Sequence, residues 1–145
     1  MKTKIVCMGY IIQDSKVLLV KHKKTNRYMS CGGHLKENEN FTECLKREIK
    51  EELNLDINII NSSSNEIKEE IPFVINNKKN ENKNLIIIEY LCKTNNFKEI
   101  KLNKNELTEF KLFSKEEVEI YNFNPSLKEI LEKIFIFIET HNNLI

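Results

Sequence analysis

A pair of glycines followed by a strongly amphipathic, acidic segment is the feature that most constrains this chain. The pair is Gly32-Gly33, and from Gly33 to Leu55 the sequence reads GHLKENENFTECLKREIKEELNL. Apolar residues recur in this segment at helical spacing, which predicts a helix with one buried face. The predicted stripe consists of Phe41, Leu45, Ile49 and Leu53. We therefore expect a glycine turn that leads into a helix packed on the core.

The flank beside this stripe is acidic. At roughly 100° per residue, Glu48, Glu51 and Glu52 share one arc of the helix. The like-charge pair of Glu48 and Glu52 costs roughly 0.2–0.5 kcal/mol in an isolated helix. Hard divalent cations bind carboxylate oxygens, so a metal ion such as Mg²⁺ would stabilise this face. A solvated surface is the alternative in a chain that is 31% charged, but Glu39 and Arg47, together with the glycine pair, favour the metal.

This combination resembles the signature box of the Nudix hydrolases, metal-dependent enzymes that cleave nucleoside diphosphates linked to another group. The matching residues are Gly33, Glu39, Arg47, Glu48, Ile49, Glu51, Glu52 and Leu55. The resemblance implies that Glu48, Glu51 and Glu52 hold Mg²⁺ or Mn²⁺, with the Gly33 carbonyl as an additional ligand. It also implies a supporting ion pair between Glu39 and Arg47, for which the planar guanidinium is suited.

The chain departs from the resembled pattern at two positions. Asn54 stands where the family has a glycine near the end of the box, and Asn is the residue that best tolerates the left-handed conformation after Gly. Cys31 stands where a proline commonly precedes the glycine pair, which removes a fixed φ angle. We expect the backbone geometry to survive both changes.

A further acid is implied by resemblance to a pattern that precedes the final helices in the family. Glu106 begins the matching run ELTEF, and Glu109 is the substitute candidate. Glu106 would be an outer metal ligand or a base, and the alternative is a plain surface acid. Because the residue that removes the proton varies within the family, Glu51, Glu52 and Glu106 are all candidates for the catalytic base.

Three polar residues are candidates for contacts with substrate. Lys21 and Lys23, at the end of a predicted strand, would meet a phosphate, although a solvated strand end is equally consistent with the sequence. His34 follows the glycine pair and would touch substrate or face water. Tyr10 and Tyr28, like Phe73, would offer a stacking surface for a base, and each is otherwise a core aromatic.

The remaining elements follow from residue periodicity and turn signals. Predicted strands cover Lys4 to Gln13, Lys16 to Lys21, Asp56 to Asn61, Ile71 to Ile75, Leu85 to Cys92 and Glu109 to Phe113. The polar tract from Asn76 to Asn84 is interpreted as a long hairpin loop. With helices on both sides, these strands predict an α/β sandwich with a mixed sheet, in agreement with the α/β/α sandwich that the resemblance implies.

Two helices are expected at the end of the chain. Ser114 and Glu117 have the spacing of a capping box, and Pro125 opens the last helix. The apolar stripe of that helix is widened by Phe135 and Phe137. The helix is therefore either deeply buried or in contact with a second subunit, and we expect a homodimer contact through Phe135 or Phe137.

Composition restricts the class of protein. A chain of 145 residues is expected to form one domain, residues 1–145. The net charge of +1 gives no support for binding a nucleic acid polymer. The four cysteines lack a C-x-x-C pair, so we expect reduced, buried thiols in preference to disulfides or zinc. No signal peptide or membrane span is apparent, and the expected location is cytoplasmic.

The predicted function is metal-dependent hydrolysis of a pyrophosphate bond in a nucleoside triphosphate or another nucleoside diphosphate-linked small molecule. One alternative is a non-catalytic module of the same fold that binds a nucleotide or metabolite. Such modules commonly lose acids of the box, and this chain keeps them. An isomerase on the same fold is a further alternative, but it would need more metal ligands and a catalytic cysteine.

Overall fold

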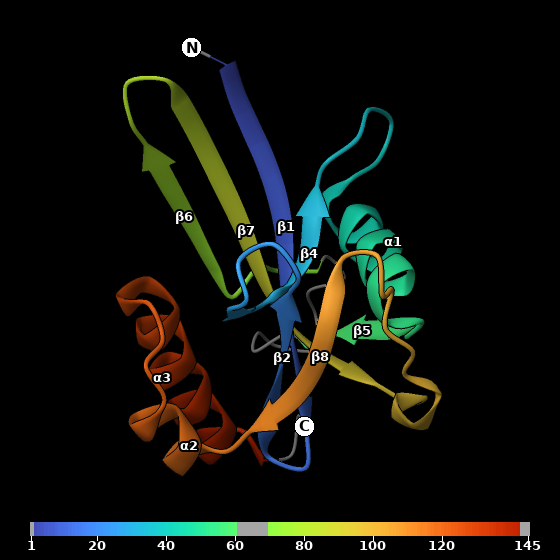
Figure 1. The fold of residues 1–145 in the computed structure, drawn as a ribbon, viewed down its shortest axis with the longest axis vertical. Helices are drawn as coiled ribbons and strands as arrows, with labels where there is room; N and C mark the ends of the chain where they lie inside the picture. The colour runs from blue at the N-terminus through green and yellow to red at the C-terminus, as the bar shows by residue number, and fades with distance from the viewer. Residues whose placement is uncertain (1, 61–69, 143–145) are drawn as a thin grey trace.

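The computed structural model describes residues 2–60 and 70–142, and the long strand β1 (Lys2–Gln13) organises them. β1 pairs in parallel with β7 (Lys83–Thr94) and antiparallel with β4 (Cys31–His34) and β2 (Lys16–His22), so the sheet is mixed. Shorter strands extend it: β3 (Tyr28–Met29), β5 (Ile57–Ile59), β6 (Val74–Lys79) and β8 (Leu107–Phe113). Figure 1 shows α1 on one side of these strands and α2 and α3 on the other.

Alternation along β1 creates a core on each face of the sheet, because successive side chains of a strand point to opposite faces. Cys7 and Ile11 pack in the core that includes helix α1 (Phe41–Leu53). Tyr10 and Ile12 pack in the core that includes helix α3 (Pro125–Thr140). The expected α/β/α sandwich with a mixed sheet is confirmed.

Helix α1 has a cap at each end, and its end at Asn54 is where the sequence predicts it. Asn40 caps it through a capping box with Glu43, which satisfies two free backbone N–H groups at the start of the helix. Asn54 ends it in the left-handed conformation, with φ of 59°. The apolar stripe is buried except at Phe41, which is 38% exposed because it lies at the first helical position, beyond the sheet-facing turns.

The predicted loop over the polar tract is wrong. β6 continues through Asn76 to Lys79, β7 begins at Lys83, and residues 80–82 alone connect them. β6 pairs only with β7 among the described strands, and every residue of β6 after Val74 is exposed, so the polarity of these residues does not oppose strand formation. The strand predicted from Ile71 begins instead at Val74, and Asn61, the predicted end of an earlier strand, lies outside the described residues.

The end of the chain corrects the expected dimer contact. Ser114 and Glu117 form the predicted capping box of α2 (Lys115–Ile120). Phe135 and Phe137 are 4% and 5% exposed and belong to the core beneath α3, so neither is available for a second subunit. The widened stripe reflects burial against both the sheet and α2, whereas Ile136 is 62% exposed.

The remaining compositional expectations concern thiols and membranes. The expectation of buried cysteines is confirmed, and none of the four lies in a disulfide: Cys7, Cys31, Cys44 and Cys92. None of the helices in the described parts of the chain combines the length and apolarity that a membrane span requires.

Candidate active site

The predicted box forms the junction between β4 and α1. Gly33 lies in β4, which pairs with β1, and faces the carboxylate of Glu48 on α1. A Cβ atom on Gly33 would lie 2.4 Å from the Cδ atom of Glu48. Glycine at this position therefore allows the Glu48 carboxylate to approach the backbone of β4.

Glu52 is the buried carboxyl group of the site. Its side chain lies one helical turn beyond Glu48, is 2% exposed, and accepts a hydrogen bond at Oε1 from the backbone N–H of Gly32 at 3.1 Å. Its other oxygen, Oε2, is buried and has no hydrogen-bond partner among the described residues. Burial, opposed by the hydrogen bond from Gly32 and assisted by the negative charges of Glu48 and Glu106, raises the pKa of Glu52 to about 8.

Arg47 holds the acids around it. Its Nε and Nη2 atoms donate to the two oxygens of Glu39 at 3.0 and 2.8 Å, so the predicted ion pair is present and bidentate. These hydrogen bonds lower the pKa of Glu39 to about 2. Arg47 Nη1 also donates to Glu48 at 2.9 Å and to Glu51 at 3.4 Å, and Nη2 donates to the carbonyl oxygen of His34.

The carboxylates of Glu48, Glu51 and Glu52 are donors that suit a hard divalent cation. Arg47 donates hydrogen bonds to two of them, Glu48 and Glu51. Within residues 2–60 and 70–142, no three His, Cys, Asp or Glu side chains converge closely enough to hold a metal ion. The unpartnered Oε2 of Glu52 is nevertheless the kind of buried oxygen that a cation would satisfy. Glu48 beside Gly33 and the half-exposed Glu51 supply the other carboxylates on the same flank of α1.

Glu106 and Glu109, the two candidate acids in the second half of the chain, have different environments in the structure. Glu106 is exposed, and its charge contributes to the raised pKa of Glu52, which places it near the box helix. Glu109 instead binds the Tyr28 hydroxyl and lies 3.5 Å from the Nζ atom of Lys21. Glu109 is therefore not the substitute for Glu106 that the sequence suggested, because its carboxylate is engaged elsewhere.

The three polar residues predicted to contact substrate have different environments. Lys21 lies 3.5 Å from a carboxylate oxygen of Glu109 and over the ring of Tyr28, 5.2 Å from its centroid, and its contact with a phosphate stays a prediction. Lys23 is exposed, and its backbone N–H donates to the carbonyl oxygen of Glu106, which places it beside the acid. His34 is exposed at the end of β4.

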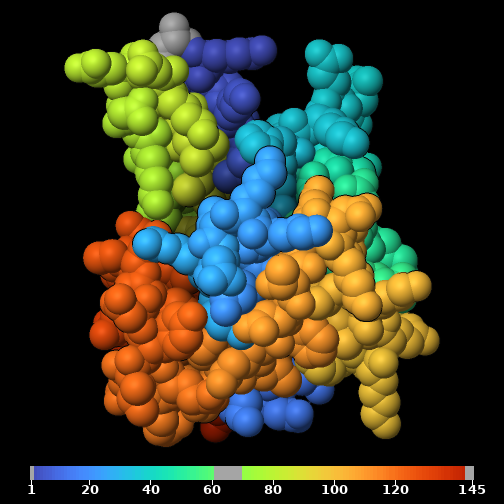
Figure 2. Space-filling view, in the orientation of Figure 1, coloured from blue at the N-terminus to red at the C-terminus, as the bar shows by residue number. Residues whose placement is uncertain are grey.

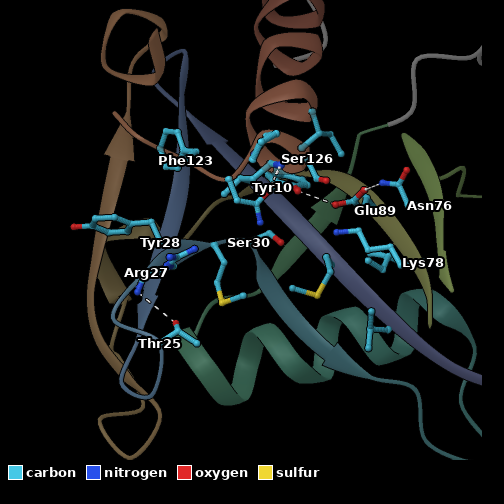
Figure 3. A pocket seen from close by; sticks show the side chains of 18 of the residues that line it. Tyr10, Thr25, Arg27, Tyr28, Ser30, Asn76, Lys78, Glu89, Phe123 and Ser126 are labelled. Carbon is cyan, nitrogen blue, oxygen red and sulfur yellow. Dashed lines mark hydrogen bonds between the residues drawn. The ribbon is translucent and has the colours of Figure 1, made fainter. Parts of the chain in front are cut away.

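A cavity of about 640 Å³ lies on the face of the sheet that packs against α3, the opposite face from α1. Figure 3 shows it between the strands and the start of α3, with Tyr28 and Arg27 on one side and Glu89 and Asn76 on the other. Of the three aromatic residues predicted to stack on a base, Tyr10 and Tyr28 line the cavity. Phe73 instead packs edge-on against Phe137 and does not line the cavity.

The cavity and the box are joined by one short stretch of chain. Met29 and Ser30 line the cavity, and Gly32 and Gly33 contact the box acids. Ser30 and Gly32 are two residues apart, about 7 Å in an extended strand. The cavity wall and the glycine turn are therefore close together along β3 and β4. Figure 2 shows the light-blue segment of residues 23–30 at the surface, between the β6–β7 hairpin and β8.

Sequence reasoning missed several residues of the cavity. Glu89 is the lone charged residue in the apolar run LIIIEYLC of β7, and this exception was a signal that could have been read. Tyr121 and Phe123 form an aromatic wall with Tyr28, and they precede α3 without any distinguishing pattern. Arg27 lies in the turn after β2, where the sequence gives no indication of a site.

Comparisons with known proteins agree with this geometry. A family model described as NUDIX domain matches residues 3–134. A NUDIX-family hydrolase from Clostridium perfringens superimposes with a TM-score of 0.80 and 23% identity, covering 95% of this chain and 99% of that one. A MutT NUDIX hydrolase from Burkholderia pseudomallei superimposes with a TM-score of 0.69 and 16% identity, covering 91% and 98%.

One curated relative shares a shorter region. The 8-oxo-dGTP diphosphatase of Buchnera aphidicola subsp. Schizaphis graminum is 39% identical over 61 residues, which are 39% of this chain and 47% of that protein. The chain thus matches about half the length of this relative.

Proposed function

Because the chain belongs to the Nudix hydrolase family, we propose that it hydrolyses a pyrophosphate bond in a nucleoside triphosphate or another nucleoside diphosphate-linked small molecule. The observation that supports this most directly is the Glu52 carboxyl group, which is buried beside the glycine turn with one oxygen unpartnered among the described residues. A buried carboxyl oxygen without a hydrogen-bond partner is costly, so a function must explain its retention.

Mg²⁺ or Mn²⁺ is the proposed cofactor. Glu48, Glu51 and Glu52 would hold the ion, with the carbonyl oxygen of Gly33 as a further ligand. When bound, such an ion neutralises phosphate charge and lowers the pKa of a coordinated water.

The chain's own residues would position this chemistry. Arg47 bonds Glu39 through two nitrogens and so fixes the loop before α1 against the helix. A carboxylate must accept the proton of the attacking water, and Glu51, Glu52 and Glu106 are the candidates.

The cavity is the proposed site for the nucleoside. Its aromatic wall offers a stacking surface, and its lining residues Met29 and Ser30 precede the glycine turn directly in the chain. The exposed Lys23 and His34 are the proposed phosphate contacts. A nucleoside triphosphate is favoured because the curated relative is an 8-oxo-dGTP diphosphatase. The net charge of +1 supports a small nucleotide rather than a nucleic acid polymer, and we propose a cytoplasmic enzyme.

A panel assay distinguishes this proposal from a non-catalytic binding module. Nucleoside triphosphates, nucleotide sugars, dinucleotide polyphosphates and coenzyme A are incubated with the protein and Mg²⁺, and release of phosphate and pyrophosphate is followed. Turnover of at least one class is expected. Binding without any turnover would favour the module.

The substitution Glu52→Gln tests the site itself. We expect turnover to fall by at least about 10²-fold with the fold intact, because positioned acid–base and metal-holding groups contribute on this scale. Glu132→Gln is the matched control, since Glu132 is exposed on α3. Circular dichroism and calorimetric Mn²⁺ titration accompany the kinetics, and near-normal turnover in Glu52→Gln would remove this residue from the mechanism.

A further inference from the structure

Glu89 is a carboxylate buried in the wall of the cavity. It lies on β7, is 6% exposed, and takes part in a line of polar groups (Figure 3). The Tyr10 hydroxyl donates to Oε1 at 2.8 Å, and the Asn76 amide donates to Oε2 at 2.7 Å. A leucine would fill this strand position without the cost of desolvating a charge. The carboxylate therefore calls for an explanation beyond packing.

The arrangement leaves Glu89 able to accept more hydrogen bonds. A carboxylate has about four lone-pair sites, and the described residues supply one donor to each oxygen. Both donors approach as they would toward an ionised acid. Burial raises the pKa of Glu89, whereas the bonds from Tyr10 and Asn76 and the positive charge of Lys78 oppose that rise. Each oxygen therefore keeps acceptor capacity, and Glu89 is among the residues that line the cavity.

We propose that Glu89 selects the base of the substrate by accepting hydrogen bonds from an edge with two adjacent N–H donors, as in guanine. This inference rests on the proposed function only in placing a nucleoside in the cavity. Guanine presents its N1–H and its exocyclic amino group side by side, which matches the two oxygens of one carboxylate.

The other bases fit this acceptor pair poorly. Uracil and thymine present a single N–H between two carbonyl oxygens, and those oxygens would face the carboxylate. Cytosine and adenine present an amino group beside a ring nitrogen that is itself an acceptor. Each of these edges sets a lone pair against a buried negative charge, so the carboxylate excludes them as well as attracting guanine.

Calorimetric titration with nucleoside monophosphates in the absence of metal tests this inference without requiring turnover. We expect GMP to bind at least about tenfold more tightly than AMP, CMP or UMP, as hydrogen bonds to a charged group allow. IMP keeps the N1–H but lacks the amino group, so it should bind more weakly than GMP. This comparison uses the unmodified protein and does not depend on the folding of any variant.

The substitution Glu89→Gln then assigns the preference to this residue. Gln has nearly the same shape but presents one donor and one acceptor, so the preference for GMP should fall about tenfold or vanish. Glu81→Gln, an exposed residue in the β6–β7 turn, should keep the original preference. A different first-ranked base, or an unchanged ranking in Glu89→Gln, would overturn the inference. If GMP is preferred but no member of the substrate panel is hydrolysed with Mg²⁺, the proposed function fails and this inference stands.

Discussion

At the scale of single residues, the two glycines before α1 lack side chains for different reasons. Gly32 has φ of +146°, and a Cβ there would lie 2.0 Å from the carbonyl oxygen of Cys7. The obstacle at Gly32 is thus backbone that cannot move freely. Gly33 is blocked by the carboxylate of Glu48, which is the end of a flexible side chain. Gly32 is therefore needed for the backbone of β4 to pair closely with β1, and Gly33 leaves space for the side chain of Glu48.

Alanine at Gly32 should therefore affect mainly stability, and alanine at Gly33 should affect mainly turnover. Gly32→Ala should lower the free energy of unfolding by more than about 2 kcal/mol, because a strained backbone and an overpacked strand are both penalised. Gly33→Ala should leave stability closer to that of the original protein but reduce turnover about tenfold or more by displacing Glu48. Thermal unfolding and steady-state kinetics measure the two effects. Equal stability losses with equal turnover would contradict this division.

At the scale of elements, helix α1 is defined by its two caps as well as by its apolar stripe. Asn40 begins it, and Asn54 ends it in the left-handed conformation while donating a side-chain bond to the carbonyl oxygen of Glu99. Both ends follow from local chemistry, although only the end at Asn54 was predicted from the sequence. Local patterns did not reveal that β6 extends to Lys79, because its pairing with β7 is a tertiary interaction that overrides the polarity of its side chains.

The end of α1 provides a prediction about backbone conformation. Asn54→Gly and Asn54→Ala both lose the amide bond to Glu99, so their difference isolates the left-handed backbone. We expect the alanine variant to be about 1 kcal/mol less stable than the glycine variant, since a Cβ disfavours this conformation. Urea denaturation gives the two free energies. A glycine variant that is no more stable than the alanine variant would show that the cap has another conformation.

At the scale of the whole molecule, the two faces of the sheet contribute different parts of the candidate site. α1 packs on one face of the sheet and carries the acids, whereas α3 packs on the other and closes one end of the cavity. Phe137 contributes to the second core and contacts Phe73 edge-on, with ring centroids 5.9 Å apart. That the whole of residues 1–145 forms a single domain stays a prediction.

The buried side of α3 can be tested against its exposed side. Phe137→Ala should lower the free energy of unfolding by about 3–5 kcal/mol, because it leaves a cavity in the core. Ile136→Ser is the matched control one residue away, with an expected change within about 0.5 kcal/mol. Chemical denaturation measures both. A small loss for Phe137→Ala would mean that this side chain is not part of the core.

The sequence by itself determined what depends on neighbouring residues along the chain. The glycine pair, the apolar stripe of α1 and its end at Asn54 lie within one short segment, and spacing along a helix fixes which side chains share a face. The metal-site candidates Glu48, Glu51 and Glu52 are predictable for the same reason. The Glu39–Arg47 ion pair lies in the same segment and was implied by the family resemblance.

Only the tertiary structure decided what depends on strands that are distant in sequence. Glu89 meets Tyr10 across the β1–β7 pair and Asn76 across the β6–β7 pair, so the polar wall of the cavity exists only after the sheet has formed. Burial likewise placed Phe137 inside the core rather than at a subunit contact. The hydrophobic pattern of a segment predicts which side of a helix or strand is buried. Which other segment packs against that side depends on the tertiary structure, because the two segments are distant in sequence.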